Sequence, residues 1–294
     1  MTLENDMQMD VQDRMKVSVI IPAYNHERYV GKALQSVVDQ TYSNVELIVI
    51  DDGSQDQTSA KIKDFIQRHS EMTIIYLQQE NKGVCNVLNL GLEIASGEYI
   101  AFLASDDYWC LEKLEDQVDF LEKNKNIGMV FSDAWMFSNE KTKPFLWSTY
   151  KSGLEKLFKN GVQNVDFYGV LLTQPLIPAL TVMIRREVLT QVGCFDRSLA
   201  YEDYDYWLRI AIHYPIAYLH RPLAYYRLHD ANVSNNAGFM LKGMMQTIGK
   251  HFREGPYRDQ PVKKMKIAFR LLMNLLVNRL KKKKKVLSAS EKER

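Results

Sequence analysis

The sequence has few cysteines and no long apolar run. Its three cysteines, Cys85, Cys110 and Cys194, are scattered through 294 residues. This number and spacing exclude a disulfide framework and a zinc site built on thiolates, so we expect ordinary reduced core residues. No window contains the ~18 apolar residues that a transmembrane helix requires, and the polar N-terminus does not resemble a signal peptide. These absences predict a cytoplasmic protein.

Two nucleotide-binding signatures are also missing. The sequence contains no G-x-G-x-x-G after its apolar runs and no G-x-x-x-x-G-K-[ST] anywhere. Both patterns use glycine to let the backbone approach a phosphate closely. Their absence argues against a nicotinamide dehydrogenase and against a phosphate-loop ATPase.

The net charge is small but unevenly distributed. The whole chain carries a formal charge of +2, yet residues 263–285 contain ten Lys or Arg residues and no acid. The remainder of the chain is therefore net negative. This asymmetry predicts that only the C-terminal segment meets a polyanionic surface.

Short apolar runs rich in β-branched residues alternate with segments of helical periodicity. The runs span residues 17–21, 45–50, 73–77, 99–103 and 127–131, and the helical segments span residues 27–40, 57–69, 84–95 and 111–123. Such runs are typical of strands buried on both faces of a parallel sheet. The alternation predicts an α/β fold with a mostly parallel, doubly wound sheet flanked by helices. Further strands are expected at 181–184 and 216–219, and a helix at 205–213.

Acidic pairs follow two of the expected strands. Asp51-Asp52 follows the second strand and Asp106-Asp107 follows the fourth, while Pro22-Ala23-Tyr24 follows the first. Ligands of open α/β sheets bind beyond the carboxyl ends of the strands, so these residues should meet at one edge. Two acidic pairs would repel each other without a cation. Mg²⁺ or Mn²⁺, bound by oxygen ligands, would also hold a diphosphate.

Each pair also has a simpler interpretation. Asp-Asp-Gly-Ser is a good turn sequence, in which Ser54 or Asp56 would cap the next helix. Asp106-Asp107 likewise precedes a capped helix. A third cluster, residues 200–207, mixes carboxylates with aromatic side chains. It suits a sugar-binding wall whose apolar surroundings raise the pKa of a carboxylate base. Equally, it could be a helix start where the dipole favours acids.

Together these segments resemble the family 2 glycosyltransferases, inverting enzymes with the GT-A fold. The resemblance runs from about Lys16 to His229 and includes VSVIIPAYNHERYVGKALQSVVDQTYSNVELIVIDDGSQDQT, GEYIAFLASDD, VGCFDRSLAYEDYDYWLRI and YYRLH. It implies a GT-A domain over residues 16–240 after a disordered tail of residues 1–15. A nucleotide-sugar half would span residues 16–132 and an acceptor half residues 133–240.

The resemblance also implies a role for each matching residue. The residues implied to bind the nucleotide sugar are Pro22, Ala23, Tyr24, Asp52, Asp106, Arg227 and His229. Among them, Asp52 would hydrogen-bond the base. Asp107 would ligate the metal, Asp203 would be the catalytic base, and Glu202 would lie beside the acceptor.

This sequence departs from the family pattern in two places. Many relatives have an additional Asp where this chain has Ala104, which removes one carboxylate but leaves Asp107. Relatives also often have Ala-Arg-Asn where this chain has Val87-Leu88-Asn89. A phosphate contact from that Arg is therefore not expected.

The expected reaction is metal-dependent transfer of a hexosyl or N-acetylhexosaminyl group from a UDP-sugar to a hydroxyl of a glycan or lipid-linked acceptor, in cell-surface polysaccharide synthesis. A single displacement assisted by Asp203 would invert the anomeric configuration, by the logic of inverting hydrolases. Two alternatives remain open. The presence of Asp52, Asp107 and Asp203 argues against a non-catalytic nucleotide-sugar binding protein. The sequence PAYNHERY, which is not a Gly-rich basic loop, argues against a nucleotidyltransferase.

Residues 241–294 are expected to form a helical, Lys-rich tail. Between residues 262 and 285, polar side chains recur every three or four positions on an otherwise apolar helix. With its flanking lysines, this pattern fits an interfacial helix on anionic lipid. Alternatively, the helix could pack on the catalytic core. No nucleic-acid recognition module accompanies the tail. We therefore expect peripheral association with the inner face of the membrane through residues 263–285.

Overall fold

The computed structural model describes residues 14–138, 141, 143–150, 154–159, 162–163 and 166–271. The strands are β1 (Val17–Ala23), β2 (Val45–Asp51), β3 (Thr73–Gln78), β4 (Tyr99–Phe102), β5 (Tyr108–Trp109), β6 (Met129–Phe137), β7 (Phe145–Leu146), β8 (Phe158–Lys159), β9 (Val162–Gln163), β10 (Val182–Arg185) and β11 (Ile216–Arg227). The helices are α1 (Val30–Val38), α2 (Thr58–Arg68), α3 (Val84–Ile94), α4 (Lys113–Lys123), α5 (Trp147–Tyr150), α6 (Phe167–Leu171), α7 (Val188–Val192), α8 (Glu202–His213) and α9 (Ala237–Glu254). Another helix begins at Pro261 and is described to residue 271.

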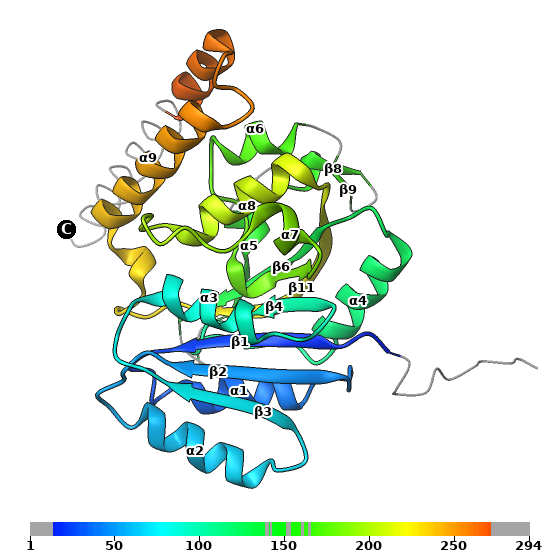
Figure 1. Cartoon of the computed structure of the whole chain (residues 1–294), viewed down its shortest axis with the longest axis vertical. Helices are drawn as coiled ribbons and strands as arrows, with labels where there is room; N and C mark the ends of the chain where they lie inside the picture. The colour runs from blue at the N-terminus through cyan, green and yellow to red at the C-terminus, as the bar shows by residue number, and fades with distance from the viewer. Residues whose placement is uncertain are drawn as a thin grey trace, which may run out of the picture.

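All these strands join one sheet, whose main path runs β3-β2-β1-β4-β10-β6-β11-β9-β8 (Figure 1). Strands β1 to β4 pair in parallel, in agreement with the apolar runs that predicted them. Beyond β4 the sheet is mixed, because β10 runs antiparallel to both β4 and β6. The α/β fold class is therefore confirmed, and the parallel arrangement is concentrated in the first half of the chain.

Strand β11 is much longer than the four-residue run expected at 216–219. It pairs in parallel with β6, and its register shifts around Pro222. Proline lacks the N–H that a continuous ladder needs, so an irregularity is expected there. Beyond the shift, the strand continues to Arg227 and so brings Arg227 and His229 to the edge where β1, β2 and β4 end.

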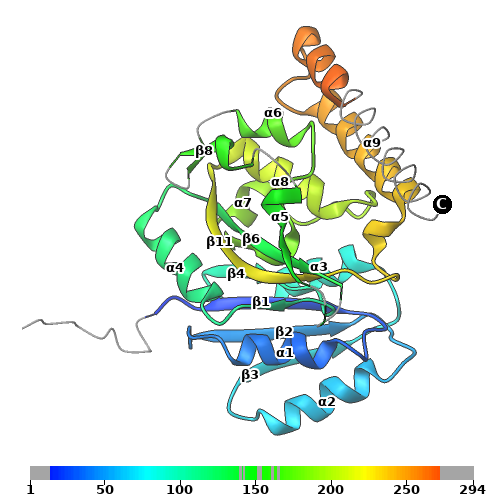
Figure 2. The same cartoon turned by 180° about the vertical axis from the view of Figure 1, so that it is seen from behind.

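Helices cover both faces of the sheet. Within β1, the fully buried Val17, Val19 and Ile21 belong to a core shared with α1, α2 and α4. The intervening Ile20 belongs to a second core, shared with α3, α7, α8 and α9. Accordingly, α3 lies in front of the sheet in Figure 1, and α1 lies in front of it in Figure 2. This is the doubly wound arrangement that the alternating pattern predicted.

The C-terminal region contains a helix that the sequence did not predict separately. Helix α9 spans the predicted domain boundary at residue 240, and that boundary stays a prediction. The following helix begins at Pro261, a residue that suits a first helical position. Residues 272–285 of the expected helix lie outside the described residues, as do residues 1–13 of the expected disordered tail. Arg14 is described, and its guanidinium bonds the Glu115 carboxylate.

Among the described residues, no helix combines the length and the apolar character that crossing a bilayer requires.

Candidate functional site

The loops that follow β1 and β2 are joined by hydrogen bonds. Asn25, in a left-handed conformation with φ of 53°, donates its N–H to Ser54 Oγ and accepts a bond from the Gln55 N–H. The Glu27 N–H donates to Asp56 Oδ2 at 3.0 Å. Ser54 and Asp56 therefore join the two loops. The N-cap of α2 is Gln57, whose side chain makes no capping bond, although Asp56 Oδ1 accepts a bond from the Thr58 N–H in the first turn.

Asp52 holds the loop of residues 79–83. Its Oδ1 accepts bonds from Gln79 Nε2 at 2.7 Å and from the Lys82 N–H at 2.9 Å, and its Oδ2 accepts one from the Gly83 N–H at 2.8 Å. A carboxylate has about four lone-pair sites, so capacity remains for a further donor. Gly53 has a φ of +77°, and a Cβ there would come within 2.8 Å of the Asn81 backbone nitrogen. The hydrogen bond expected between Asp52 and the nucleotide base stays a prediction.

The residues after β1 lie along this edge of the sheet with different exposures. Ala23 is buried, Pro22 is partly buried, and Tyr24 is 44% exposed. An exposed aromatic ring beyond a strand end offers a face for stacking. The pocket-lining role that the family resemblance implies for these residues stays a prediction.

Two histidines approach the Asp106 carboxylate. His229 Nε2 lies 2.9 Å and His26 Nε2 lies 3.9 Å from Asp106 Oδ2. The other ring nitrogen of His26 is 2.8 Å from Ser105 Oγ. Donor atoms of His26, Asp106 and His229 all lie within 4.8 Å of one another, close enough to share one metal ion.

Arg227 fixes the acidic loop to the end of β11. Its backbone N–H donates to Asp107 Oδ1 at 2.7 Å, and its Nε donates to the Asp106 carbonyl at 2.9 Å. The guanidinium lies 4.7 Å from the ring centroids of both Tyr29 and Phe137. Four residues predicted from the sequence, Asp106, Asp107, Arg227 and His229, are thus brought together.

Burial changes the ionisation of this cluster. It raises the pKa of the Asp107 carboxyl well above its usual value, and the negative charge of Asp106 raises it further. Burial also lowers the pKa of His26, against the opposing effect of Asp106. A neutral imidazole is the form that binds a metal.

The predicted base and its neighbour occupy the first turn of α8. Burial raises the pKa of the Asp203 carboxyl well above its usual value, and the charge of Glu202 adds to this effect. Burial likewise raises the pKa of Glu202. Asp203 lines a small, largely apolar hollow with Leu176, Ile177 and Trp207. A carboxylate in such surroundings is a stronger base than one in water.

Tyr226 connects the two acidic regions. Burial raises the pKa of its hydroxyl to about 12, and the charges of Asp107, Asp106 and Asp203 all contribute to the increase. Electrostatic effects of this kind decay rapidly with distance. The start of α8 and the loop after β4 therefore both lie near the Tyr226 phenol.

Sequence reasoning missed several residues of this site. His26 lies in the matched PAYNH segment but was given no role, although it lies in the loop that follows β1. Asn232, whose Nδ2 lies 3.5 Å from Asp106 Oδ2, follows β11 at a point where composition carries no signal. The strand-end rule, applied to every polar residue rather than to acids, would have found His26.

The donor set of His26, Asp106 and His229 fits a divalent cation. Carboxylate oxygen suits Mg²⁺ and Mn²⁺, whereas two imidazoles favour Mn²⁺ or another transition metal over Mg²⁺. Asp107, the metal ligand implied by the resemblance, directs Oδ1 to the Arg227 N–H instead. Its role as a ligand stays a prediction.

Comparisons with solved structures agree on the fold. Staphylococcus aureus TarS 1–349 in complex with UDP-GlcNAc has a TM-score of 0.65 and 23% identity, covering 88% of this chain and 72% of that one. The mannosyltransferase PcManGT from Pyrobaculum calidifontis, in complex with GDP-Man and Mn²⁺, has a TM-score of 0.65 and 19% identity, covering 97% of this chain and 83% of that one. The GT-A fold is thereby confirmed.

Sequence comparisons identify the family. The Escherichia coli protein WfgD, a UDP-Glc:alpha-D-GlcNAc-diphosphoundecaprenol beta-1,3-glucosyltransferase, is 34% identical over 83% of this chain and 89% of its own length. The chain spans 66% of the length of two uncharacterized Rickettsia glycosyltransferases, with which it shares 31% identity. The family model Glycosyl transferase family 2 matches residues 18–173, more than half of the sequence. The chain belongs to glycosyl transferase family 2.

Proposed function

We propose that this glycosyltransferase transfers a hexosyl or N-acetylhexosaminyl group from a UDP-sugar to a hydroxyl of a lipid-linked glycan, with inversion, in cell-surface polysaccharide synthesis. The observation that carries the proposal is the cluster of Asp106, Asp107, Arg227 and His229 beyond the strand ends. The charge of Asp203 acts on Tyr226 together with those of Asp106 and Asp107. Support for the substrates comes from WfgD, named for UDP-Glc and a diphosphoundecaprenol acceptor. TarS supports a UDP-sugar donor, because it was solved with UDP-GlcNAc.

Asp203 acts as the general base in this proposal. As the acceptor oxygen attacks the anomeric carbon, its proton passes to the Asp203 carboxylate. The bond from the anomeric carbon to the diphosphate breaks on the opposite face, so one displacement inverts the configuration. A carboxylate whose pKa is raised toward the working pH takes up a proton more effectively.

Leaving-group charge is neutralised beside the loop that follows β4. Arg227 is fixed there by Asp106 and by Tyr29, with its guanidinium at the end of β11. His26, Asp106 and His229 would hold a divalent cation, which when bound would stabilise charge on the departing diphosphate.

The reaction is tested by incubating the protein with UDP-Glc or UDP-GlcNAc, a GlcNAc-diphospho-lipid acceptor and either Mn²⁺ or Mg²⁺. We expect UDP release with formation of a longer lipid-linked glycan, faster with Mn²⁺, and its loss in EDTA. Release of pyrophosphate from UTP and a sugar 1-phosphate, with no UDP release from the UDP-sugar, would instead identify a nucleotidyltransferase. UDP-sugar binding without turnover on any acceptor would favour a non-catalytic binding protein.

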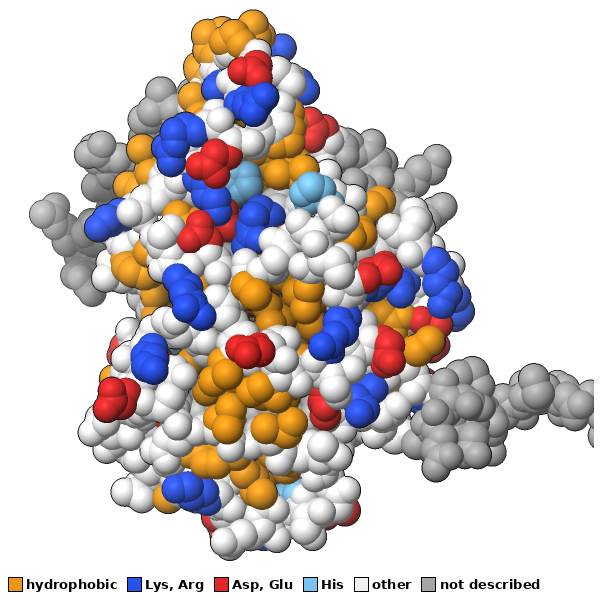
Figure 3. All heavy atoms as spheres, in the orientation of Figure 1, with side chains coloured by type: hydrophobic (Ala, Val, Ile, Leu, Met, Phe, Trp, Pro, Cys, Tyr) orange, Lys and Arg blue, Asp and Glu red, His pale blue; other side chains and the backbone are white. Residues whose placement is uncertain are grey.

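We also propose that the helix at residues 261–271 lies on an anionic membrane surface. Its Ile267 packs into the core, whereas Val262, Met265 and Phe269 are 58%, 66% and 62% exposed. Figure 3 shows hydrophobic side chains beside Lys and Arg side chains at this tip of the molecule. An apolar stripe flanked by cations suits anionic lipid. The matching prediction for residues 272–285 lies outside the described residues.

This surface predicts salt-sensitive binding to vesicles. We expect the protein to sediment with phosphatidylserine vesicles at low salt and to be released at high salt, because each Lys or Arg contributes about 1 kcal/mol that ions screen. Phe269→Asp should weaken sedimentation severalfold. Leu111→Asp, at an exposed leucine 53% accessible outside this helix, is the matched control and should bind normally. Equal binding of the Phe269→Asp and parent proteins would refute the proposal.

A further inference from the structure

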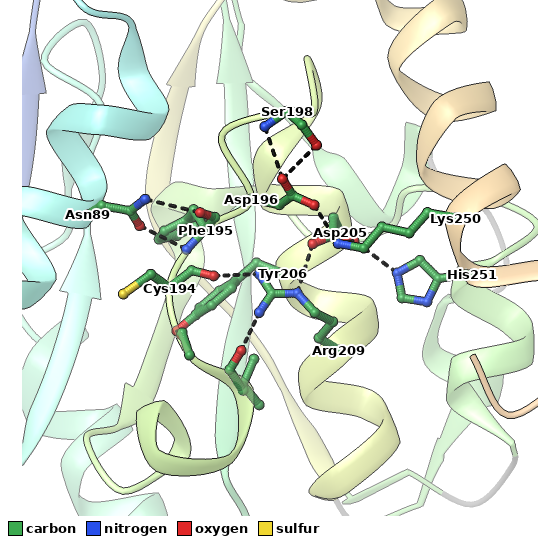
Figure 4. Close-up of polar contacts among 12 residues, drawn as sticks. Asn89, Cys194, Phe195, Asp196, Ser198, Asp205, Tyr206, Arg209, Lys250 and His251 are labelled. Carbon is green, nitrogen blue, oxygen red and sulfur yellow. Dashed lines mark hydrogen bonds and ion pairs between the residues drawn. The ribbon is translucent and has the colours of Figure 1, made fainter. Parts of the chain in front are cut away.

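The first turns of α8 contain a fully buried carboxylate that contacts an Arg, a Lys and a His side chain. Asp205, with 0% exposure, accepts a bond from Arg209 Nε at 2.8 Å on Oδ2. Its Oδ1 lies 3.1 Å from both His251 Nε2 and Lys250 Nζ (Figure 4). Arg209 belongs to α8 itself, whereas Lys250 and His251 belong to α9. The Asp205 carboxylate thus links α8 to two residues of α9.

Lys250 makes a second bond that reaches the segment before α8. Its Nζ lies 2.7 Å from Asp196 Oδ2, and the bond from Lys250 holds the pKa of Asp196 well below its usual value. Asp196 also accepts bonds from the N–H and hydroxyl of Ser198. One ammonium group therefore fixes both the loop leading into α8 and the helix itself, as the dashed contacts in Figure 4 show.

Helix α9 also touches the residue that directly precedes Glu202. A Cβ on Gly243 would come within 2.9 Å of Tyr201 Cβ and within 3.3 Å of the Tyr201 backbone nitrogen. Tyr201 is the N-cap of α8, and its side chain makes no capping bond within the described part of the chain. The start of α8 is therefore positioned by tertiary contacts rather than by a local cap.

We propose that α9 acts as a brace that sets the position of Asp203, and that Lys250 and His251 are positioning residues for this base. The inference rests on the proposed role of Asp203. Asp203 lies between the two bracing points, two residues after Tyr201 and two before Asp205. A displacement of about 1 Å at a reacting group can lower a rate 100-fold without contact to the substrate.

A contribution to position explains the ionic contacts better than a contribution to stability alone. Buried ion pairs are often no more stabilising than apolar residues of the same size, because removing charges from water is unfavourable. Their bonds are directional, however, so they specify one arrangement of the two helices. Donor-binding residues on β1, β2 and β4 lie outside this network.

The test compares Lys250→Met with Lys250→Arg and with Lys242→Met, which changes an exposed lysine on the same helix. For Lys250→Met we expect kcat to fall about tenfold or more, with the KM for the UDP-sugar and calorimetric UDP affinity within about twofold of the parent. Lys250→Arg should recover most of kcat, since it keeps the positive charge. Lys242→Met should behave like the parent protein.

Two additional measurements make every outcome decisive. Hydrogen exchange at residues 202–205 should be faster in Lys250→Met and unchanged in Lys242→Met, a result that does not depend on catalysis. Should Lys250→Met not fold, Gly243→Ala, which pushes α9 from Tyr201, should give the same selective loss of kcat. Unchanged kcat and exchange in a folded variant, or equal losses of kcat and UDP affinity, would overturn the brace. A parent protein without turnover would instead count against the proposed function. Hydrogen exchange at residues 202–205 would then be the measurement that tests the brace.

Discussion

Asp203→Asn is expected to lower kcat by about 10²- to 10⁴-fold, the usual contribution of a general base. The amide has nearly the same shape but cannot take up the acceptor proton. UDP affinity should stay within about twofold, because Asp203 lies on α8 rather than on the strand-end loops expected to bind the nucleotide. Steady-state kinetics and calorimetry with UDP measure the two quantities. Asp64→Asn, at an exposed carboxylate on α2, is the control.

The pH dependence gives a second signature of the same residue. The base must be ionised, and burial raises the pKa of Asp203 well above its usual value. Consequently kcat/KM should fall as pH decreases through this raised pKa, at a higher pH than for an ordinary aspartate. The residual activity of Asp203→Asn should lack that acidic limb. An identical limb in parent and variant, or near-normal turnover of the variant, would exclude Asp203 as the base.

Stability should change in the opposite direction to activity. Because the folded-state pKa of Asp203 exceeds its unfolded value, the folded protein binds more protons between the two values, and stability is lost as pH rises through this range. Above this range, the ionised and partly buried carboxylate therefore destabilises the fold. Asp203→Asn should melt at the same temperature as the parent protein or higher, whereas replacing a residue that serves only in packing would lower the Tm.

How much could be predicted from the sequence depends on whether a feature is local. The strand VSVII and the pair Asp106-Asp107 behind the strand YIAFL were predictable, since period and strand-end position are encoded within a few residues. Helix α9 was not predicted as a separate element. It contains Gly238, Gly243 and Gly249, each unfavourable in a helix by about 1 kcal/mol relative to Ala. The contacts with α8 that stabilise α9 cannot be read from the sequence of α9 itself.

The contacts in the site that could not be predicted from the sequence join residues far apart in the chain. Asp205 was recognised only as one of several acids, and its partner His251 is 46 residues away. Asp52 was expected to hydrogen-bond the nucleotide base. Its oxygens also accept bonds from a loop about 30 residues further along the chain. Neither partner follows from spacing or composition, because the fold alone brings them together. Family resemblance compensated at Arg227, the last residue of the 12-residue strand β11, and at His229 just beyond it, because both lie past the run that periodicity predicted.

Asp106→Asn should separate two assignments of the metal ligands. If His26, Asp106 and His229 hold the cation, losing the charge of Asp106 should weaken Mn²⁺ affinity by about 10- to 100-fold. It should also lower kcat by about 10²- to 10³-fold, the range for losing one group that stabilises developing charge. Calorimetric titration of Mn²⁺ in the presence of UDP measures the first effect. Asp230→Asn, at an exposed carboxylate adjacent to His229, should match the parent protein.

The companion variant Asp107→Asn decides between the alternatives. The charge of Asp106 contributes to the raised pKa of Asp107, so the two carboxylates are not independent, and ionising both is unfavourable unless a cation lies between them. Under the histidine-containing assignment, His26→Gln and His229→Gln should each reduce Mn²⁺ affinity, whereas Asp107→Asn should do so less than Asp106→Asn. Were only Asp107→Asn to abolish Mn²⁺ binding, Asp107 would be the ligand, as the family resemblance implies. His229 and His26 would then serve to orient Asp106 toward the donor.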